Sequence, residues 1–229
     1  MKILAIETST MLGGLAVMDD LHGLIAEVRV SVKTGHSEKL MLELHHILSS
    51  AGLKLKDIDA IAVATGPGSF TGLRIGLSTA KGLSYTTGLP LVAVPTLEAF
   101  AWSMPYSPHP VCPMLDARKK EVYAGVFIHK KDDMKRLIPE TSIKPKQLAL
   151  SLKDKKKVLF AGEGAVIYMK ELKEILGDKA VFVPPHLMSP SAASVAYLGL
   201  RKALKAEFSD PATVCPLYIR KSEAELKMP

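Results

Sequence analysis

Residues 64–76 read ATGPGSFTGLRIG, and they join a β-prone apolar run at 58–63 to a segment with helical spacing. A glycine-rich turn that leads from a strand into a helix presents free backbone N–H groups, which favour anions. The stretch lacks the Gly-Lys-Ser/Thr of a Walker loop, and Gly72 falls one residue too late for a dinucleotide fingerprint. It therefore predicts a strand–turn–helix unit of an α/β protein.

The same turn also fits a purely structural role. A tight connection from a strand to a helix needs positive φ at Gly66 or Gly68. Ser69 or Thr71 then caps the first turn of the helix. Both interpretations stay open on the sequence.

The helix expected over residues 72–87 carries a stripe of small side chains at i, i+4 spacing: Gly72, Gly76, Ala80 and Ser84. Such a stripe lets another helix approach closely. That helix belongs either to a partner protein or to the segment 37–50 of the same chain. In the second case the stripe packs against apolar side chains of that segment, namely Leu40, Leu44 and Ile47.

Hydrophobic periodicity divides the chain into two halves that each open with three strands and continue with strands and helices. In the first half we expect strands at 2–8, 12–18 and 22–32, a helix at 37–50, a strand at 58–63, a helix at 72–87, a strand at 91–94 and a helix at 96–103. In the second half we expect strands at 111–115, 122–128, about 137–143 and 158–161, a helix at 164–176, a strand at 181–183 and a helix at 192–204. Strands that alternate with helices imply parallel pairing.

Three prolines within residues 104–110 can extend neither a helix nor a central strand, so we place the boundary between two lobes there. The expected lobes are 1–103, and 104–229 with a short, frayed C-terminal tail. Their duplicated βββαβα order resembles the actin, sugar-kinase and Hsp70 superfamily. The expected fold is therefore α/β with two related lobes and a cleft between them, which does not settle the function.

The composition is that of an ordinary globular protein, with 48% hydrophobic and 23% charged residues. No apolar run approaches the ~18 residues of a membrane span, so we expect a cytoplasmic protein without membrane contact. The net charge of +7 is concentrated in the second half, for example at 118–120 and 153–157. Such clusters attract phosphate backbones, although lysines at loop tips also serve solubility alone.

Three segments carry a resemblance to one family: MKILAIETST at 1–10, GHSEKLMLELHHIL at 35–48, and IAVATGPGSFTGLRIGLSTAKGLSYTTGLPLVAVPTLEAFA at 61–101. Together they resemble the TsaB (YeaZ) family, and MLDARKKEVY at 114–123 resembles the opening of the family's second lobe. Beyond about residue 130 only the layout matches. The resemblance implies a non-catalytic subunit that works with TsaD and TsaE in the threonylcarbamoylation of adenosine 37 in tRNA.

TsaB is a paralogue of TsaD, which carries an H-x-x-x-H metal pair after its glycine block. In this chain the aligned positions are Thr96 and Phe100, and a phenylalanine cannot ligate a metal. His36, His45 and His46 lie on one expected helix at spacings that do not converge on one face. We therefore expect no metal site.

Active superfamily members hold magnesium and wrap the phosphates with an acidic strand end followed by glycine and a hydroxyl residue. Here the two equivalent turns read ETST from Glu7 and DARKK from Asp116, without that glycine. The resemblance and the residues both predict a pseudo-enzyme without catalytic residues. We expect no cofactor to bind the chain alone, and ATP or ADP binding in the complex stays open.

The expected interaction surface lies on the helices at 37–50 and 72–87. Its predicted contact residues, for TsaD and for a homodimer in isolation, are Leu40, Leu44, Gly72, Gly76 and Ala80. The predicted auxiliary contacts to a nucleotide or to tRNA, made through the complex, are Arg74, Arg118 and Lys119.

Two functions of other classes stay open. One is an ATP-dependent phosphotransferase of the sugar-kinase type that uses Glu7 or Asp116. The other is a stand-alone tRNA-binding module on the basic second lobe, for which no interleaved aromatic residues are visible.

Overall fold

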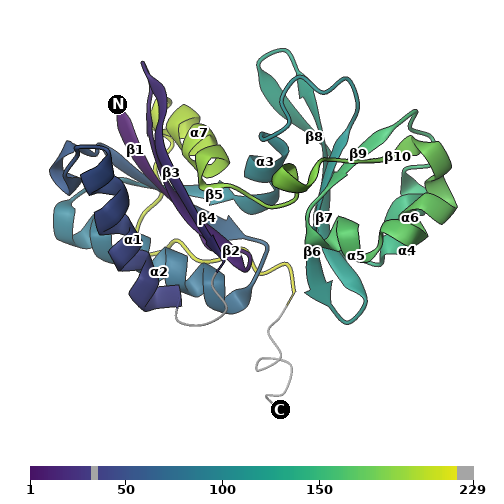
Figure 1. The fold of residues 1–229 in the computed structure, drawn as a ribbon, viewed down its shortest axis with the longest axis horizontal. Coiled ribbons are helices and arrows are strands. Elements are labelled where there is room, and N and C mark those ends of the chain that lie inside the picture. Colours follow the sequence, from purple (N-terminus) through teal and green to yellow (C-terminus); the bar gives the residue numbers. More distant parts are fainter. Residues whose placement is uncertain (32–35, 221–229) are drawn as a thin grey trace. The chain divides into compact units, whose positions relative to one another are not determined.

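The computed structural model describes residues 1–31 and 36–220, the side chains of 36–39 excepted. The chain forms two compact units (Figure 1). Unit 1 consists of Met1–Ala99 and Pro190–Leu217, and unit 2 of Phe100–Ser189 together with residues 218–220 of the described chain. Within the described residues, no helix is long and apolar enough to cross a membrane.

Unit 1 contains a five-stranded mixed sheet with the order β3-β2-β1-β4-β5. Its strands are β1 (Lys2–Glu7), β2 (Leu12–Asp19), β3 (Gly23–Ser31), β4 (Ala60–Gly66) and β5 (Leu91–Pro95). The first three pair antiparallel, and β1, β4 and β5 pair parallel. The central strand β1 is buried on both faces, which explains its almost continuous apolar sequence.

Helices cover both faces of this sheet (Figure 1). On one face lie α1 (His36–Ser50) and α2 (Phe70–Thr87), whose apolar sides form a core with Leu4, Ile6 and Ile61. On the other face lies α7 (Ala192–Ala203). A Cβ at Gly199 of α7 would meet Ala62 and Ile3 of the sheet, so this helix packs closely on the strands.

Unit 2 repeats the topology with the order β10-β9-β6-β7-β8. Its strands are β6 (Val111–Arg118), β7 (Glu121–Lys130), β8 (Asp133–Ile143), β9 (Val158–Ala161) and β10 (Ala180–Phe182). Its core joins Met114, Val122 and Phe160 to the apolar sides of α4 (Pro145–Ser151), α5 (Glu163–Ile167) and α6 (Met169–Leu176). The remaining elements are α3 (Thr96–Ala101), which spans the division between the units, and 3-10 helices at Leu55–Asp57, Gly177–Lys179 and Pro185–Leu187.

The predicted duplication is confirmed strand by strand, but two details differ. The order is βββαβαβα in both halves, and α4 has no counterpart among the predicted helices. This helix has only seven residues and begins at Pro145, so its apolar period is too short to stand out. The helix predicted at 164–176 is divided at Tyr168 into α5 and α6.

The predicted second lobe, 104–229, needs correction. Residues 190–217 belong to unit 1, where α7 contacts β1, β2 and β4. The physical reason is the second face of the unit 1 sheet, which presents Ile3, Ala5 and Ala62 and needs an apolar cover. The apolar side of α7, with Val195 and Leu198, supplies it.

Candidate functional site

The glycine-rich block forms a tight connection between β4 and α2. Gly66 has φ +113°, and Ser69 is the N-cap, whose hydroxyl accepts the Gly72 N–H at 3.3 Å. At the other end of α2, Gly88 ends the helix in the left-handed conformation. The structural role predicted for Gly66 and Ser69 is therefore confirmed.

This block packs against the end of β1. The Ser69 N–H donates to the Ser9 carbonyl at 2.8 Å, and the Thr8 hydroxyl donates to the Gly72 carbonyl at 2.8 Å. A Cβ at Gly72 would overlap the Thr8 carbonyl, and a Cβ at Gly76 would overlap the Thr8 hydroxyl. Gly72 and Gly76 therefore allow α2 to approach the end of β1 in its own unit.

The predicted contact residues on α1 and α2 are consequently wrong as outward-facing contacts. Leu40, Leu44 and Ala80 lie in the core of unit 1, and Gly72 and Gly76 face Thr8 as described. An apolar or small stripe on a surface helix is first of all the stripe that covers its own sheet. The alternative of packing within the same lobe is the one that the structure supports.

The outward faces of α1 and α2 carry residues that the sequence interpretation missed. On α1, Met41 and Leu42 are 50% and 55% exposed, and on α2, Tyr85 is 65% exposed. Gly82 of α2 is exposed, and a Cβ there would meet no atom within 4 Å. These positions could have been found as the complement of the core stripe on each helix.

The turn after β1 is closed by its own neighbours. Glu7 is fully buried, and its Oε1 accepts the Ser9 N–H at 2.6 Å. Within the described part of the chain, neither Glu7 Oε2 nor the Ser9 hydroxyl has a hydrogen-bond partner. Burial raises the pKa of Glu7 from its ordinary value of 4.5 to about 7. Glu7 is therefore a desolvated carboxyl group inside the packing of unit 1.

The positions aligned with the metal pair of TsaD are also buried. Thr96 accepts the Gly66 N–H at 3.0 Å through its hydroxyl, and Phe100 is among the largest fully buried side chains. His45 and His46 lie exposed on α1, and the side chain of His36 lies outside the described residues. Among the residues described, no group of three or more His, Cys, Asp or Glu side chains is placed to hold a metal ion.

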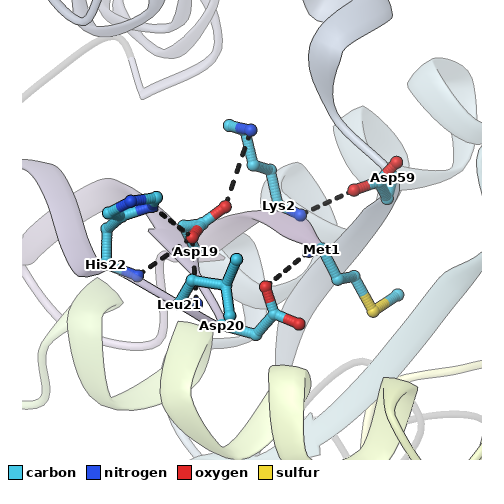
Figure 2. Close-up of polar contacts among 7 residues, drawn as sticks. All are labelled: Met1, Lys2, Asp19, Asp20, Leu21, His22 and Asp59. Carbon is cyan, nitrogen blue, oxygen red and sulfur yellow. Dashed lines mark hydrogen bonds and ion pairs between the residues drawn. The ribbon is translucent and has the colours of Figure 1, made fainter.

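The other end of β1 holds a second polar cluster (Figure 2). The Met1 ammonium donates to Asp20 at 2.6 Å, and the Lys2 N–H donates to Asp59 at 2.6 Å. Asp19 accepts the backbone N–H groups of His22 and Leu21, and the His22 N–H above all holds the Asp19 pKa well below its usual range. These contacts fasten the start of β1 to the β2–β3 turn and to the residue before β4, and they serve the fold.

The basic candidates lie in two different units. Arg74 is on the exposed side of α2, 6.0 Å from the Phe70 ring centre. Arg118 and Lys119 lie in the turn between β6 and β7, where Arg118 pairs with Asp116 at 3.2 Å. Within unit 2, Arg220 reaches this turn and donates to the Ala117 carbonyl at 3.3 Å.

Sequence comparison decides the family. The model of the family described as "TsaD: tRNA N6-adenosine threonylcarbamoyltransferase" matches residues 25–228. The tRNA threonylcarbamoyladenosine biosynthesis protein TsaB of Bacillus subtilis (strain 168) is 32% identical over 228 residues, which cover 99% of this chain and 97% of the relative. The chain belongs to the TsaB family. The resemblance of the glycine-rich block and its flanks is thereby confirmed over the whole chain.

Solved structures agree with this assignment. YeaZ from Pseudomonas aeruginosa superposes with a TM-score of 0.80 at 25% identity, covering 95% of this chain and 99% of that one. A ROK hexokinase from Thermus thermophilus superposes with a TM-score of 0.52 at 15% identity, over 87% and 100% of the two chains. The second likeness shows the fold alone, and it confirms the predicted sugar-kinase type of α/β fold for this TsaB-family chain.

Proposed function

We propose that this chain is the non-catalytic partner subunit of threonylcarbamoyladenosine synthesis at adenosine 37 of tRNA, acting with TsaD and TsaE in the cytoplasm. Membership of the TsaB family supports the pathway, because the curated Bacillus relative is named for this biosynthesis. The observation that carries the non-catalytic role is the closed turn after β1. There Ser69 donates to the Ser9 carbonyl, and the glycine block fills the space beside Thr8.

A phosphotransferase of this fold needs that turn for the phosphates of ATP. Its backbone N–H groups and an ionised acid have to face the nucleotide. In this chain the turn residues Thr8, Ser9 and Thr10 are buried, and Glu7 has a raised pKa because it is desolvated. These features favour the partner subunit over the sugar-kinase alternative. We accordingly assign no cofactor to the chain alone, and any ATP or ADP to the assembled complex.

The partner surface is the outward face of α1 and α2, defined by Met41, Leu42, Gly82 and Tyr85. The two helices lie side by side on one face of the sheet, so their exposed residues belong to one surface (Figure 1). Large exposed apolar side chains beside a glycine offer both buried area and close approach to a partner helix. TsaD is the proposed occupant, and in its absence two copies of the chain pair through the same face.

Gly82→Arg tests this surface without disturbing the unit's own packing, because the position has open space around it. The matched control is Gln147→Arg, which adds the same charge to the exposed side of α4. We expect Gly82→Arg to abolish co-elution with TsaD in size-exclusion chromatography, and Gln147→Arg to leave it intact. Equal co-elution of both variants with TsaD would contradict the assignment of this surface as the TsaD contact.

The subunit role is tested by reconstituting tRNA modification from purified proteins with and without this chain. We expect an absolute requirement for the chain, together with no transfer and no ATP turnover by the chain alone. Magnesium-dependent ATP turnover in isolation would instead support the phosphotransferase. Tight, salt-sensitive tRNA binding without TsaD would support the stand-alone RNA-binding module.

A further inference from the structure

The turn between β6 and β7 has an unusual choice of residues for its backbone. Arg118 pairs with Glu121, so Lys119 and Lys120 form a two-residue loop. All three basic residues have positive φ, at 61°, 51° and 61°. Two-residue hairpins with positive φ at both loop positions favour Asn-Gly or Gly-Gly, because a Cβ is disfavoured there. Folding alone therefore does not explain the two lysines.

This turn also carries an excess of positive charge. Of its carboxylates, Asp116 pairs with Arg118 at 3.2 Å, and Glu121 lies 3.5 Å from the Arg220 guanidinium. Glu163 is a third carboxylate near Asp116. Among the residues that the structure describes around this turn, four basic side chains, those of Arg220 and residues 118–120, outnumber these three acids. Arg118 is 86% exposed, and both loop lysines are exposed.

The other end of the same strand gives a contrast. The β7–β8 turn is also a two-residue loop, closed by the pair Lys130 and Asp133. Its residues 130–133 read KKDD, so its basic and acidic charges are equal in number. Lys131 of this turn also has positive φ, at 56°. Lysines with positive φ therefore occur at two hairpin tips of unit 2. Within the described residues of this unit, only the β6–β7 turn combines positive φ at three successive basic residues with a net positive charge.

We propose that the β6–β7 turn is a contact for the RNA phosphate backbone, which helps to hold tRNA on the assembled complex. The inference rests on the proposed function, which brings tRNA to the complex. Lysine at the tip of a hairpin presents a hydrated point charge without planar or base-specific geometry. Such a group suits backbone phosphates, which position an RNA without reading its sequence.

The test uses Lys119→Asn with Lys120→Gly in the reconstituted complex. This pair removes both charges and installs the residues that the turn prefers, so it folds readily. The control is Lys130→Asn with Lys131→Gly, which removes two lysines at the other end of β7. We expect the first variant to raise the KM for tRNA about tenfold with unchanged kcat, and the control to leave KM unchanged. Between about 50 and about 200 mM salt, the advantage of wild type over the first variant shrinks about tenfold.

Four other outcomes of this experiment would contradict either the RNA contact or the proposed function. If the chain is required for the reaction but the KM and its salt dependence match wild type, the RNA contact is refuted while the proposed function stands. Loss of co-elution with TsaD would assign the turn to a protein contact and overturn the inference. A change confined to the KM for ATP would assign it to the phosphates of a nucleotide and overturn it equally. A reaction that proceeds without the chain would refute the proposed function itself.

Discussion

Glu7 gives a prediction that links burial to stability. Its carboxyl group is fully buried, and burial raises its pKa from 4.5 to about 7. The folded state therefore holds a proton that the unfolded state has already lost between these two pH values. Stability contributed by this proton is fully present below pH ~4.5 and is lost as the pH rises through ~7. Glu7→Gln removes this ionisation and should remove the loss.

The magnitude follows from the shift. Each pKa unit corresponds to about 1.36 kcal/mol, so a rise of about 2.5 units corresponds to roughly 3 kcal/mol. Above pH ~7 the Gln variant should exceed wild type in free energy of unfolding by an amount of this order. Well below pH ~4.5 the difference should vanish, because the Glu7 carboxyl of wild type is then protonated in both the folded and the unfolded state.

Urea unfolding of both proteins at several pH values between about 5 and about 8 measures this difference. Glu174→Gln, at an exposed carboxylate on α6, is the control for the loss of one charge. A Glu7→Gln effect that stays constant over this pH range would refute the reasoning. An effect that grows toward acid pH would refute it as well, because that sign belongs to a carboxylate stabilised in its charged form.

Three further predictions concern stability measured by urea unfolding. Gly76→Ala should lower it by roughly 2 kcal/mol, because the new methyl group overlaps the Thr8 hydroxyl; an unchanged midpoint would mean that α2 shifts freely. Leu44→Ala should lower the free energy of unfolding by about 2–5 kcal/mol, because the side chain lies in the core. A decrease below about 0.5 kcal/mol would contradict its place in the core. Lys119→Asn with Lys120→Gly should raise stability by about 1 kcal/mol by relieving positive φ, and destabilisation would contradict that strain.

Much of the fold could be predicted because the hydrophobic periodicity of strands and helices is clear in both halves of the sequence. The strand β7 and the helix α1 occur where their patterns predicted them, although β7 is buried on both faces and shows no alternation of burial. The position of α7 could not be predicted in this way. Periodicity shows that one side of a helix is apolar, but it does not say which sheet that side covers. Chain order suggested the second unit, whereas the uncovered face lay in the first.

The candidate site was predicted unevenly for a related reason. Positions where a metal-ligating side chain is replaced, such as Phe100 in place of a histidine, could be recognised from the sequence alone. Residues that make contacts could not, because Leu44 and Met41 are both apolar and only packing separates them. Leu44 is buried against the sheet, while Met41 is half exposed. The same holds for Gly76 and Gly82, which differ only in what surrounds their Cα atoms.

The return of the chain to unit 1 has a consequence for biosynthesis. Unit 2 is built mainly from the continuous stretch Phe100–Ser189, whereas unit 1 lacks α7 until the ribosome has passed residue 203. A nascent chain that ends before this helix leaves Ile3 and Ala62 on a bare sheet surface, which invites chaperones or aggregation. The unit whose synthesis begins first is therefore completed only after the main stretch of unit 2, Phe100–Ser189, has been made.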